Sequence, residues 1–212
     1  AVLFGVADYV PALMKYIEKY AVDLNFSHRL VAVDGPGKRA TFLRTLPDGS
    51  SETRIEAFDM LHVVPPQVAP DFIRESPLAD SAGWVDVDPH TLRHRKYTNV
   101  HALGDVANTS NAKTAAAARK QAPVVANNVL VALGRLATLA QYDGYGSCPL
   151  TVENGKVILA EFGYGGKLLP TFPLDPTVPR KSAWLLKATL LPWFYWQGML
   201  KGREWFTDCK PD

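Results

Sequence analysis

A short apolar run that ends in Gly-Asp, followed by a long alanine-rich stretch, constrains the fold of this chain more than any other feature. Residues 99–105 are predicted to form a buried strand that ends at Gly104 and Asp105. A loop of small polar residues then leads into a helix expected over about 113–139. Strand, loop and helix in this order build parallel α/β sheets, which place ligands at the carboxyl ends of their strands. The sequence therefore predicts an α/β fold.

The Gly-Asp pair suits a nucleotide or flavin site. The Asp105 side chain can accept hydrogen bonds from ribose or ribityl hydroxyls, and the N-terminus of the following helix offers free N–H groups and a positive dipole. The alternative is that Gly104 and Asp105 only turn the chain and cap a helix. No Gly-x-Gly-x-x-Gly occurs in the sequence, so the chain is expected to contribute at most half of a dinucleotide site.

Hydrophobic patterning on either side of this unit divides the chain further. Before it, an amphipathic helix is expected from the apolar stripe at residues 6, 10, 13 and 17, followed by a β-meander and a short strand that stops at Pro65-Pro66. After it, two strands are joined by the turn Asn154-Gly155. The expected strands are 23–33, 39–45, 53–58 and 60–64 in the first part, and 145–152 and 156–162 in the last.

Only two cysteines occur, Cys148 and Cys209, which is too few for a disulfide scaffold. Cys148 lies in an expected strand just beyond the long helix, where it is either a redox-active thiol or a small buried hydrophobic residue. Cys209 lies in a polar tail and is expected to be exposed and incidental. The five histidines are scattered without the spacing of a metal site, so no metal is expected.

An uncharged, aromatic-rich segment lies near the C-terminus. Residues 188–200 carry no charge and include four consecutive aromatics, but thirteen residues are too few to span a bilayer. An unbroken helix would align Lys187, Gln197 and Lys201 in one polar stripe, which favours a segment lying in the membrane surface. The alternative is a helix that covers the core or a dimer interface.

Two further properties bound the function. The net charge of +2 gives no indication of nucleic-acid binding. The N-terminus has neither an initiator Met nor a basic leader, and it runs straight into an apolar segment, so we expect the chain to be the middle of a longer polypeptide.

An ordered set of short motifs resembles the sulfide:quinone oxidoreductases of mitochondria and related bacteria. Each motif is weak alone, but the set covers nearly the whole chain in the same order as in that family. The motifs are FGV (4–6), MLHV (60–63), PP (65–66), SPLAD (76–80), AGWVDVD (82–88), LGD (103–105), AKTAAA (112–117), YDGYGSCPL (142–150) and VILAEF (157–162).

The resemblance implies partial FAD/NAD(P)-binding Rossmann-like domains of the disulfide-oxidoreductase flavoprotein type, with a C-terminal amphipathic membrane-associating region. Residues 1–66 then correspond to the end of the second nucleotide-binding-type domain. Residues 67–140 correspond to the returning part of the FAD domain, and residues 141–212 to the region of the redox cysteine, the quinone and the membrane. The glycine fingerprint of the family is expected upstream of residue 1.

The resemblance also implies a mechanism and its residues. Hydrogen sulfide attacks a disulfide or trisulfide between two redox cysteines, one of which matches Cys148, while the other lies outside this chain and is not matched by Cys209. Asp105 matches the acid that contacts FAD, and Lys113 and Thr114 begin the helix that faces the flavin ring. Electrons pass through FAD to a quinone, and the sulfane sulfur leaves to glutathione, sulfite or another sulfide.

Further expectations concern the location and state of the protein. The resemblance implies a peripheral protein of the bacterial cytoplasmic membrane or the mitochondrial inner membrane, with a homodimer left open. With half a flavin site and one redox cysteine, the chain alone is expected to be inactive. Two alternatives remain: a type II NADH:quinone dehydrogenase-like flavoprotein, which needs no Cys148, and an inactive membrane-binding or dimerisation module.

Overall fold

The computed structural model describes residues 2–111 and 113–203. In this part of the chain the fold is mixed α/β, and its two sheets are both antiparallel. The chain forms two compact units, one of residues 1–5 with 14–67 and the other of residues 6–13 with 68–212. The division therefore falls within helix α1 (Val10–Lys19), which follows a 3₁₀ turn at Ala7–Tyr9.

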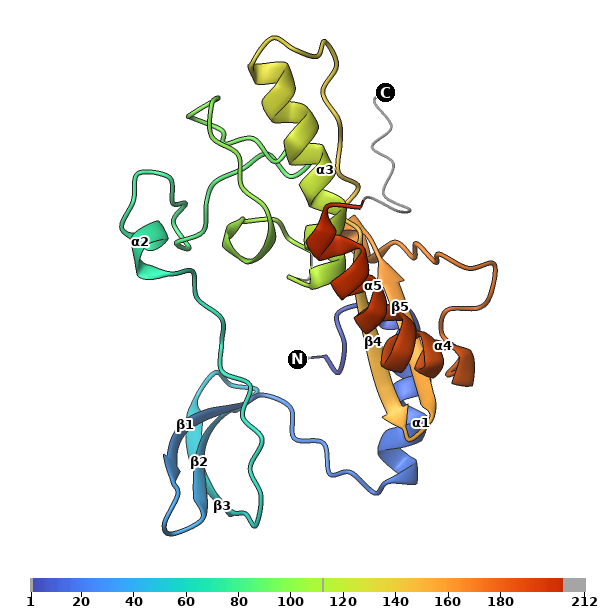
Figure 1. Ribbon diagram of the computed structural model, residues 1–212. Coiled ribbons are helices and arrows are strands. Elements are labelled where there is room, and N and C mark those ends of the chain that lie inside the picture. Colours follow the sequence, from blue (N-terminus) through green and yellow to red (C-terminus); the bar gives the residue numbers. More distant parts are fainter. Residues whose placement is uncertain (1, 112, 204–212) are drawn as a thin grey trace. The chain divides into compact units, whose positions relative to one another are not determined.

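The first unit contains a three-stranded meander of β1 (His28–Asp34), β2 (Arg39–Thr45) and β3 (Ser51–Ala57), in that order (Figure 1). Tight turns join the strands, and in the first of them the Asp34 carboxylate accepts a hydrogen bond of 2.9 Å from the Gly37 N–H. Across the second turn, Arg44 lies opposite Glu52 and forms a 2.9 Å ion pair with it. The three strands predicted for this part are confirmed, with the first beginning later than expected.

The strand predicted at residues 60–64 is wrong. These residues have no regular structure, and Met60 and Val64 are exposed. An apolar run forms a strand only where a neighbouring strand satisfies its backbone, and none of the described strands pairs with this segment.

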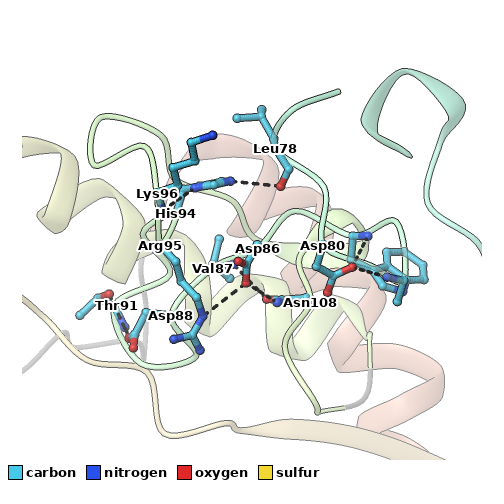
Figure 2. A network of polar contacts seen from close by, with 12 residues as sticks. Leu78, Asp80, Asp86, Val87, Asp88, Thr91, His94, Arg95, Lys96 and Asn108 are labelled. Atoms are coloured by element: carbon cyan, nitrogen blue, oxygen red, sulfur yellow. Dashed lines mark hydrogen bonds and ion pairs between the residues drawn. The ribbon is translucent and has the colours of Figure 1, made fainter. Parts of the chain in front are cut away.

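In the second unit, residues 76–108 fold without a regular strand and are held by scattered backbone hydrogen bonds and by polar side chains (Figure 2). The buried His94 ring bonds to the Leu78 carbonyl oxygen at 3.1 Å. The Asp86 carboxylate accepts from the Asn108 amide at 3.0 Å and pairs with Arg95 at 3.3 Å. Isolated backbone hydrogen bonds and polar side chains thus together satisfy the polar groups of this segment in place of a continuous β-ladder.

The strand predicted at residues 99–105 is also wrong. His101 makes a single isolated bridge with Arg93, and Gly104–Val106 is a 3₁₀ turn. The only parallel contact among the described residues is an isolated bridge between Val85 and Ala107, so the expected parallel sheet is not formed there. A parallel strand pairs with a strand that is distant in sequence. The described residues supply only one such parallel bridge, which is too little to form a parallel sheet.

The long helix is confirmed but is shorter than predicted. Helix α3 runs from Ala115 to Ala132 and ends beside Gly134, whose φ of 69° is the left-handed conformation that commonly terminates helices. One of its faces is buried against a core of apolar residues from the segments around it. The buried residues of α3 are Ala117, Gln121, Pro123, Val124 and Asn128, and the core is made of Val85, Val87, Leu92, Ala107, Val124, Ala140 and Tyr142.

The last sheet is the predicted hairpin of β4 (Gly146–Glu153) and β5 (Lys156–Phe162). Gly155 has a φ of 76°, which explains the glycine in the Asn154-Gly155 turn. β5 forms much of the core of this region, because Val157, Ile158 and Ala160 are fully buried. The remaining short elements of the second unit are α2 (Asp71–Arg74) and a 3₁₀ turn at Tyr164–Gly166.

The C-terminal segment is helical but not regular. It consists of α4 (Lys181–Leu185), a π-helical turn at Leu186–Leu190, α5 (Leu191–Gln197) and a 3₁₀ turn at Met199–Lys201, and α4 packs against β5 (Figure 1). The unbroken helix that would align Lys187 with Lys201 is therefore not formed. Within the described residues, no helix has the length and apolar character needed to cross a membrane.

Candidate functional site

Cys148 lies in β4, opposite Ala160 of β5, and its side chain is half-buried. It is not in a disulfide. Burial raises the pKa of the Cys148 thiol above its ordinary value, so the free side chain is a neutral thiol near pH 7. Cys209 lies outside the described residues. Among the described residues, no group of three or more His, Cys, Asp or Glu side chains could hold a metal ion.

The β4–β5 hairpin has two distinct faces. Residues directly opposite one another in an antiparallel pair share a face, and successive residues alternate between faces. Cys148 therefore shares a face with Ala160, while Ser147 shares the other face with Glu161. The Cys148 thiol and the Glu161 carboxylate therefore lie on opposite faces of the hairpin.

The predicted cofactor-binding pair Gly104 and Asp105 lies in the 3₁₀ turn before α3. Gly104 has a φ of 68°, which favours glycine, and its N–H donates to the Gln121 Oε1 at 2.7 Å. Asp105 is exposed, so its carboxylate is accessible to a ligand. Gln121, which holds the Gly104 turn through this bond, is a residue that sequence reasoning missed. The only available signal was a polar residue on the buried face of an otherwise apolar helix.

Thr114 and Lys113 lie at the start of α3. Thr114 is the N-cap, and its hydroxyl accepts a hydrogen bond of 3.2 Å from the Ala117 N–H. The Lys113 ammonium group instead lies 4.2 Å from the centre of the Trp84 ring and donates to the Ala107 carbonyl oxygen. Burial lowers the pKa of Lys113, an effect that the nearby Asp105 partly opposes.

Buried polar groups connect the Gly104 turn to the hairpin that carries Cys148. Gln121, which accepts from Gly104, lies near Tyr142, where its side chain partly opposes the rise in the Tyr142 pKa that burial causes. The Tyr142 hydroxyl donates to the Tyr145 carbonyl oxygen at 2.5 Å, immediately before β4 begins. The structure thus links the two sets of predicted residues, Gly104 with Asp105 and Cys148, through buried polar groups of α3 and the segment before β4.

An apolar pocket of about 220 Å³ lies on the Glu161 side of the hairpin. This is smaller than the roughly 300 Å³ at which typical ligand pockets begin, so it suits one ring or a segment of an apolar chain. The π-helical turn contributes Leu186 and Leu190 to its wall, and π-turns are frequent at functional sites. The other lining residues are Leu159, Glu161, Pro170, Phe172, Leu174, Asp175, Pro176, Val178, Arg180, Ser182 and Ala183.

Two polar residues of this wall, Glu161 and Arg180, have buried polar atoms. Glu161 is only 3% exposed, and its carboxylate accepts hydrogen bonds of 2.5 Å from both the Tyr145 and the Thr171 hydroxyls. The Arg180 Nε is buried and has no hydrogen-bond partner among the described residues. Sequence reasoning identified neither residue, because both depend on burial by distant segments.

The aromatic segment at the C-terminus is partly docked and partly exposed. Lys187 donates to the Pro149 carbonyl oxygen at 2.8 Å and to the Thr151 hydroxyl at 2.7 Å, which holds the π-helical turn against β4. Arg119 of α3 lies 4.6 Å from the centre of the Phe194 ring. Trp193 and Trp196 remain 56% and 62% exposed.

Comparison with known proteins identifies relatives along almost the whole chain. The mitochondrial sulfide:quinone oxidoreductases of Mus musculus and Dictyostelium discoideum are each 42% identical to it, over 94% and 97% of its length. The resemblance to sulfide:quinone oxidoreductases is confirmed. The Schizosaccharomyces pombe sulfide:quinone oxidoreductase is 38% identical over 96% of the chain. The chain spans less than half of these relatives, 44–45% of their length.

The fold has a counterpart among solved structures, whereas no protein-family model matches the chain. A chain in the cryo-EM structure of the Tetrahymena thermophila mitochondrial ATP synthase F1Fo composite tetramer superposes with a TM-score of 0.67 at 25% identity. The match covers 93% of this chain and 44% of that one.

Proposed function

We propose that this chain is the C-terminal part of a flavoprotein that oxidises hydrogen sulfide to sulfane sulfur and passes the electrons to a quinone. The observation that carries the proposal is the 38–42% identity to sulfide:quinone oxidoreductases, which extends over at least 94% of the chain. In this proposal residues 1–66 complete a second nucleotide-binding-type domain, residues 67–140 return to a Rossmann-like FAD domain, and residues 141–212 form the redox, quinone and membrane region.

The residues of the second unit fit half of an FAD site. The exposed Asp105 carboxylate can accept hydrogen bonds from ribityl or ribose hydroxyls. The first turn of α3 carries N–H groups without intrahelical partners, of which the Thr114 side chain satisfies one. Their dipole would stabilise negative charge on a flavin ring, and Lys113 adds a cation nearby. When bound, FAD would accept two electrons from sulfur and deliver them to the quinone.

Cys148 is proposed to form a disulfide or trisulfide with a cysteine outside this chain. Hydrosulfide attacks one sulfur of that bridge, which breaks the S–S bond, leaves a persulfide on the attacked cysteine and releases the other as a thiolate. A thiol of raised pKa is the poorer leaving group, and burial raises the pKa of Cys148. Against a partner cysteine of ordinary pKa, attack is therefore favoured at the Cys148 sulfur, and the persulfide stays there until glutathione, sulfite or sulfide removes it.

The apolar pocket on the other side of the hairpin is the proposed quinone site. A quinone ring is flat and apolar, with carbonyl oxygens that need hydrogen-bond donors. The pocket offers apolar walls with Arg180 and Glu161 as its buried polar groups. Because Cys148 and Glu161 lie on opposite faces of the hairpin, sulfide and quinone would approach the redox centre separately.

The exposed Trp193 and Trp196 rings support peripheral attachment to a membrane, from which a quinone would enter. The relatives named above are mitochondrial, which favours the mitochondrial inner membrane over a bacterial cytoplasmic membrane. The proposal is compatible with either a monomer or a homodimer.

The decisive test is sulfide-dependent reduction of a short-chain ubiquinone, measured without oxygen on the full polypeptide that contains this chain. The Cys148→Ser variant is expected to lose at least 100-fold in rate, because it cannot form the bridge that sulfide attacks. Cys209→Ser is the matched control and is expected to retain activity. Equal activity of Cys148→Ser and the unchanged protein would contradict the assignment, and NADH oxidation without sulfide oxidation would favour the NADH:quinone dehydrogenase alternative.

A further inference from the structure

The mouth of the apolar pocket is formed by lining residues that are also exposed, because a side chain can line a pocket and still meet solvent only where the pocket opens. The segment between β5 and α4 contributes Phe172, Leu174 and Val178, which are 47%, 52% and 41% exposed. Leu190, at the end of the π-helical turn, is 51% exposed and lines the same pocket. The pocket therefore opens through a rim that is largely apolar.

Polar residues form a smaller share of this rim. Asp175 and Ser182 are the exposed polar residues among those that line the pocket. The Asp175 carboxylate accepts from the Thr177 N–H at 2.9 Å and from the Thr177 hydroxyl at 2.7 Å. The carboxylate is thus held in its own turn at the surface of the protein.

The segment 169–180, which carries most of the rim, is tethered to β5 near both of its ends (orange in Figure 1). Near its start, the Leu169 N–H donates to the Glu161 carbonyl oxygen at 3.1 Å. At its end, Arg180 and Val157 exchange both of their backbone hydrogen bonds, at 2.9 and 3.2 Å. The apolar side chains between these two tethers are therefore presented to the outside from a fixed backbone.

The apolar rim continues directly into the exposed surface of the C-terminal helices. Leu190 is followed at once by α5, which carries the exposed Trp193 and Trp196. Leu185, at the end of α4, is 58% exposed as well. Contiguous exposed apolar surface of this kind is uncommon on a soluble protein and marks a site that binds another protein or a membrane.

The charges around the rim favour lipid over a second copy of the same surface. Residues 163–181 contain the basic residues Lys167, Arg180 and Lys181 but a single acidic residue, Asp175. Anionic headgroups would pair with this excess of positive charge, whereas two such surfaces placed face to face would bring like charges together. A membrane surface is therefore the occupant that fits both the apolar rim and its charges.

We propose that residues 170–178 form a second membrane contact, in which Phe172 and Leu174 enter the bilayer surface and bring the mouth of the pocket against lipid. Asp175 follows them and stays at the level of the headgroups, so the contact is shallow. The inference rests on the proposed function for its consequence, which is that a long-tailed quinone passes from the bilayer into the pocket while its tail remains in lipid. The membrane contact itself does not depend on which ligand the pocket holds.

Vesicle binding of the full polypeptide tests the contact. Vesicles of equal parts phosphatidylcholine and phosphatidylserine are sedimented with the unchanged protein and with the double variant Phe172→Ser, Leu174→Ser. The double variant is expected to bind about tenfold more weakly, because two apolar side chains no longer enter the lipid.

The matched control is the double variant Phe72→Ser, Val68→Ser, which removes an exposed aromatic and an exposed aliphatic side chain elsewhere in the second unit. It is expected to bind vesicles as the unchanged protein does. Phe172→Leu keeps the rim apolar and is expected to retain binding, which separates loss of apolar contact from loss of the native side chain. The melting temperature of each variant reports folding.

Amide hydrogen exchange supplies a readout that needs no substitution. When the same vesicles are added to the unchanged full polypeptide, exchange in peptides over residues 170–178 is expected to slow several-fold, while exchange over residues 66–75 stays the same. Equal vesicle binding by the two double variants would overturn the proposal, as would unchanged exchange over 170–178.

Protection of residues 170–178 that appears without vesicles and grows with protein concentration would also overturn the proposal, because a second copy would then cover the rim. A failure of the proposed function gives a different result. Absence of sulfide-dependent quinone reduction by the unchanged protein would overturn that function, whereas vesicle-dependent protection of 170–178 would still support the membrane contact.

Discussion

His101 illustrates how a single buried group makes stability depend on pH. Its Nε2 is buried and has no hydrogen-bond partner among the described residues, and it lies in the segment that leads to Gly104. Burial, with a smaller contribution from the Arg93 charge, lowers the pKa of His101 below the ordinary value of 6.5. The folded protein therefore favours the neutral ring.

We predict that His101 destabilises the fold in mild acid. Below pH 6.5 the unfolded chain binds a proton at this residue that the folded chain resists, so stability is full above pH 6.5 and falls as the pH decreases. One such group contributes a slope of at most about 1.4 kcal/mol per pH unit. Urea unfolding at pH 7.5, 6.5 and 5.5 measures this slope.

His101→Gln is expected to flatten the dependence, whereas replacing the exposed His62 by Gln leaves His101 in place and serves as the control. Identical slopes for His101→Gln and the unchanged protein would show that another group causes the effect.

Helix α3 shows how polar residues fix one element against others. Asn128 lies on its buried face and satisfies three backbone groups: it donates to the Thr91 carbonyl at 2.8 Å and the Ala140 carbonyl at 3.0 Å, and accepts from the Ala140 N–H at 2.8 Å. Its half-buried neighbour Asn127 donates to the Thr138 carbonyl oxygen at 3.0 Å in a bond that is exposed to water, and to the Asn128 Oδ1 at 3.1 Å. The same residue type therefore has two different roles one position apart.

We predict that Asn128→Leu lowers the free energy of unfolding by about 2–4 kcal/mol, because it leaves buried backbone groups unpaired. Asn127→Leu, the control, is expected to cost about 1 kcal/mol or less, since water can replace its exposed hydrogen bond. Chemical denaturation of both variants measures the difference. Equal losses would mean that the buried network around Ala140 does not determine how α3 docks.

Among the residues that the structure describes, the exposed tryptophans lie in α5, where the proposed membrane attachment lies. Trp193 and Trp196 are more than half exposed, although Lys187 ties the preceding π-helical turn to β4. Phe72 in α2 is 74% exposed and lies outside this segment. Exposure alone therefore does not separate Trp193 and Trp196 from Phe72. The two tryptophans differ from Phe72 in belonging to the C-terminal segment that is proposed to attach to the membrane.

We predict that replacing Trp193 and Trp196 together by Ser weakens co-sedimentation of the full polypeptide with anionic vesicles by about tenfold or more. Each ring forfeits on the order of 1 kcal/mol of interfacial burial. Phe72→Ser removes a more exposed aromatic from another part of the chain and is expected to leave vesicle binding unchanged. Similar losses in both variants would indicate nonspecific adhesion rather than attachment through α5.

Elements made by neighbouring residues could be predicted from the sequence. The meander β1–β3, the hairpin β4–β5 with its Asn154-Gly155 turn, and the position of Cys148 in β4 follow from local alternation and turn residues. The resemblance to sulfide:quinone oxidoreductases was also readable, because short motifs kept their order along the chain.

Tertiary structure alone decided the features that need distant partners. The runs 60–64 and 99–105 are apolar enough for strands, but none of the described strands pairs with them, so their backbones follow other paths. Glu161 resembles any polar residue of an alternating strand until Tyr145 and Thr171 surround it and the C-terminal helices close a pocket beside it. The local sequence pattern determines which helices and strands form. Burial by remote segments determines which polar side chains are placed in an environment that alters their reactivity.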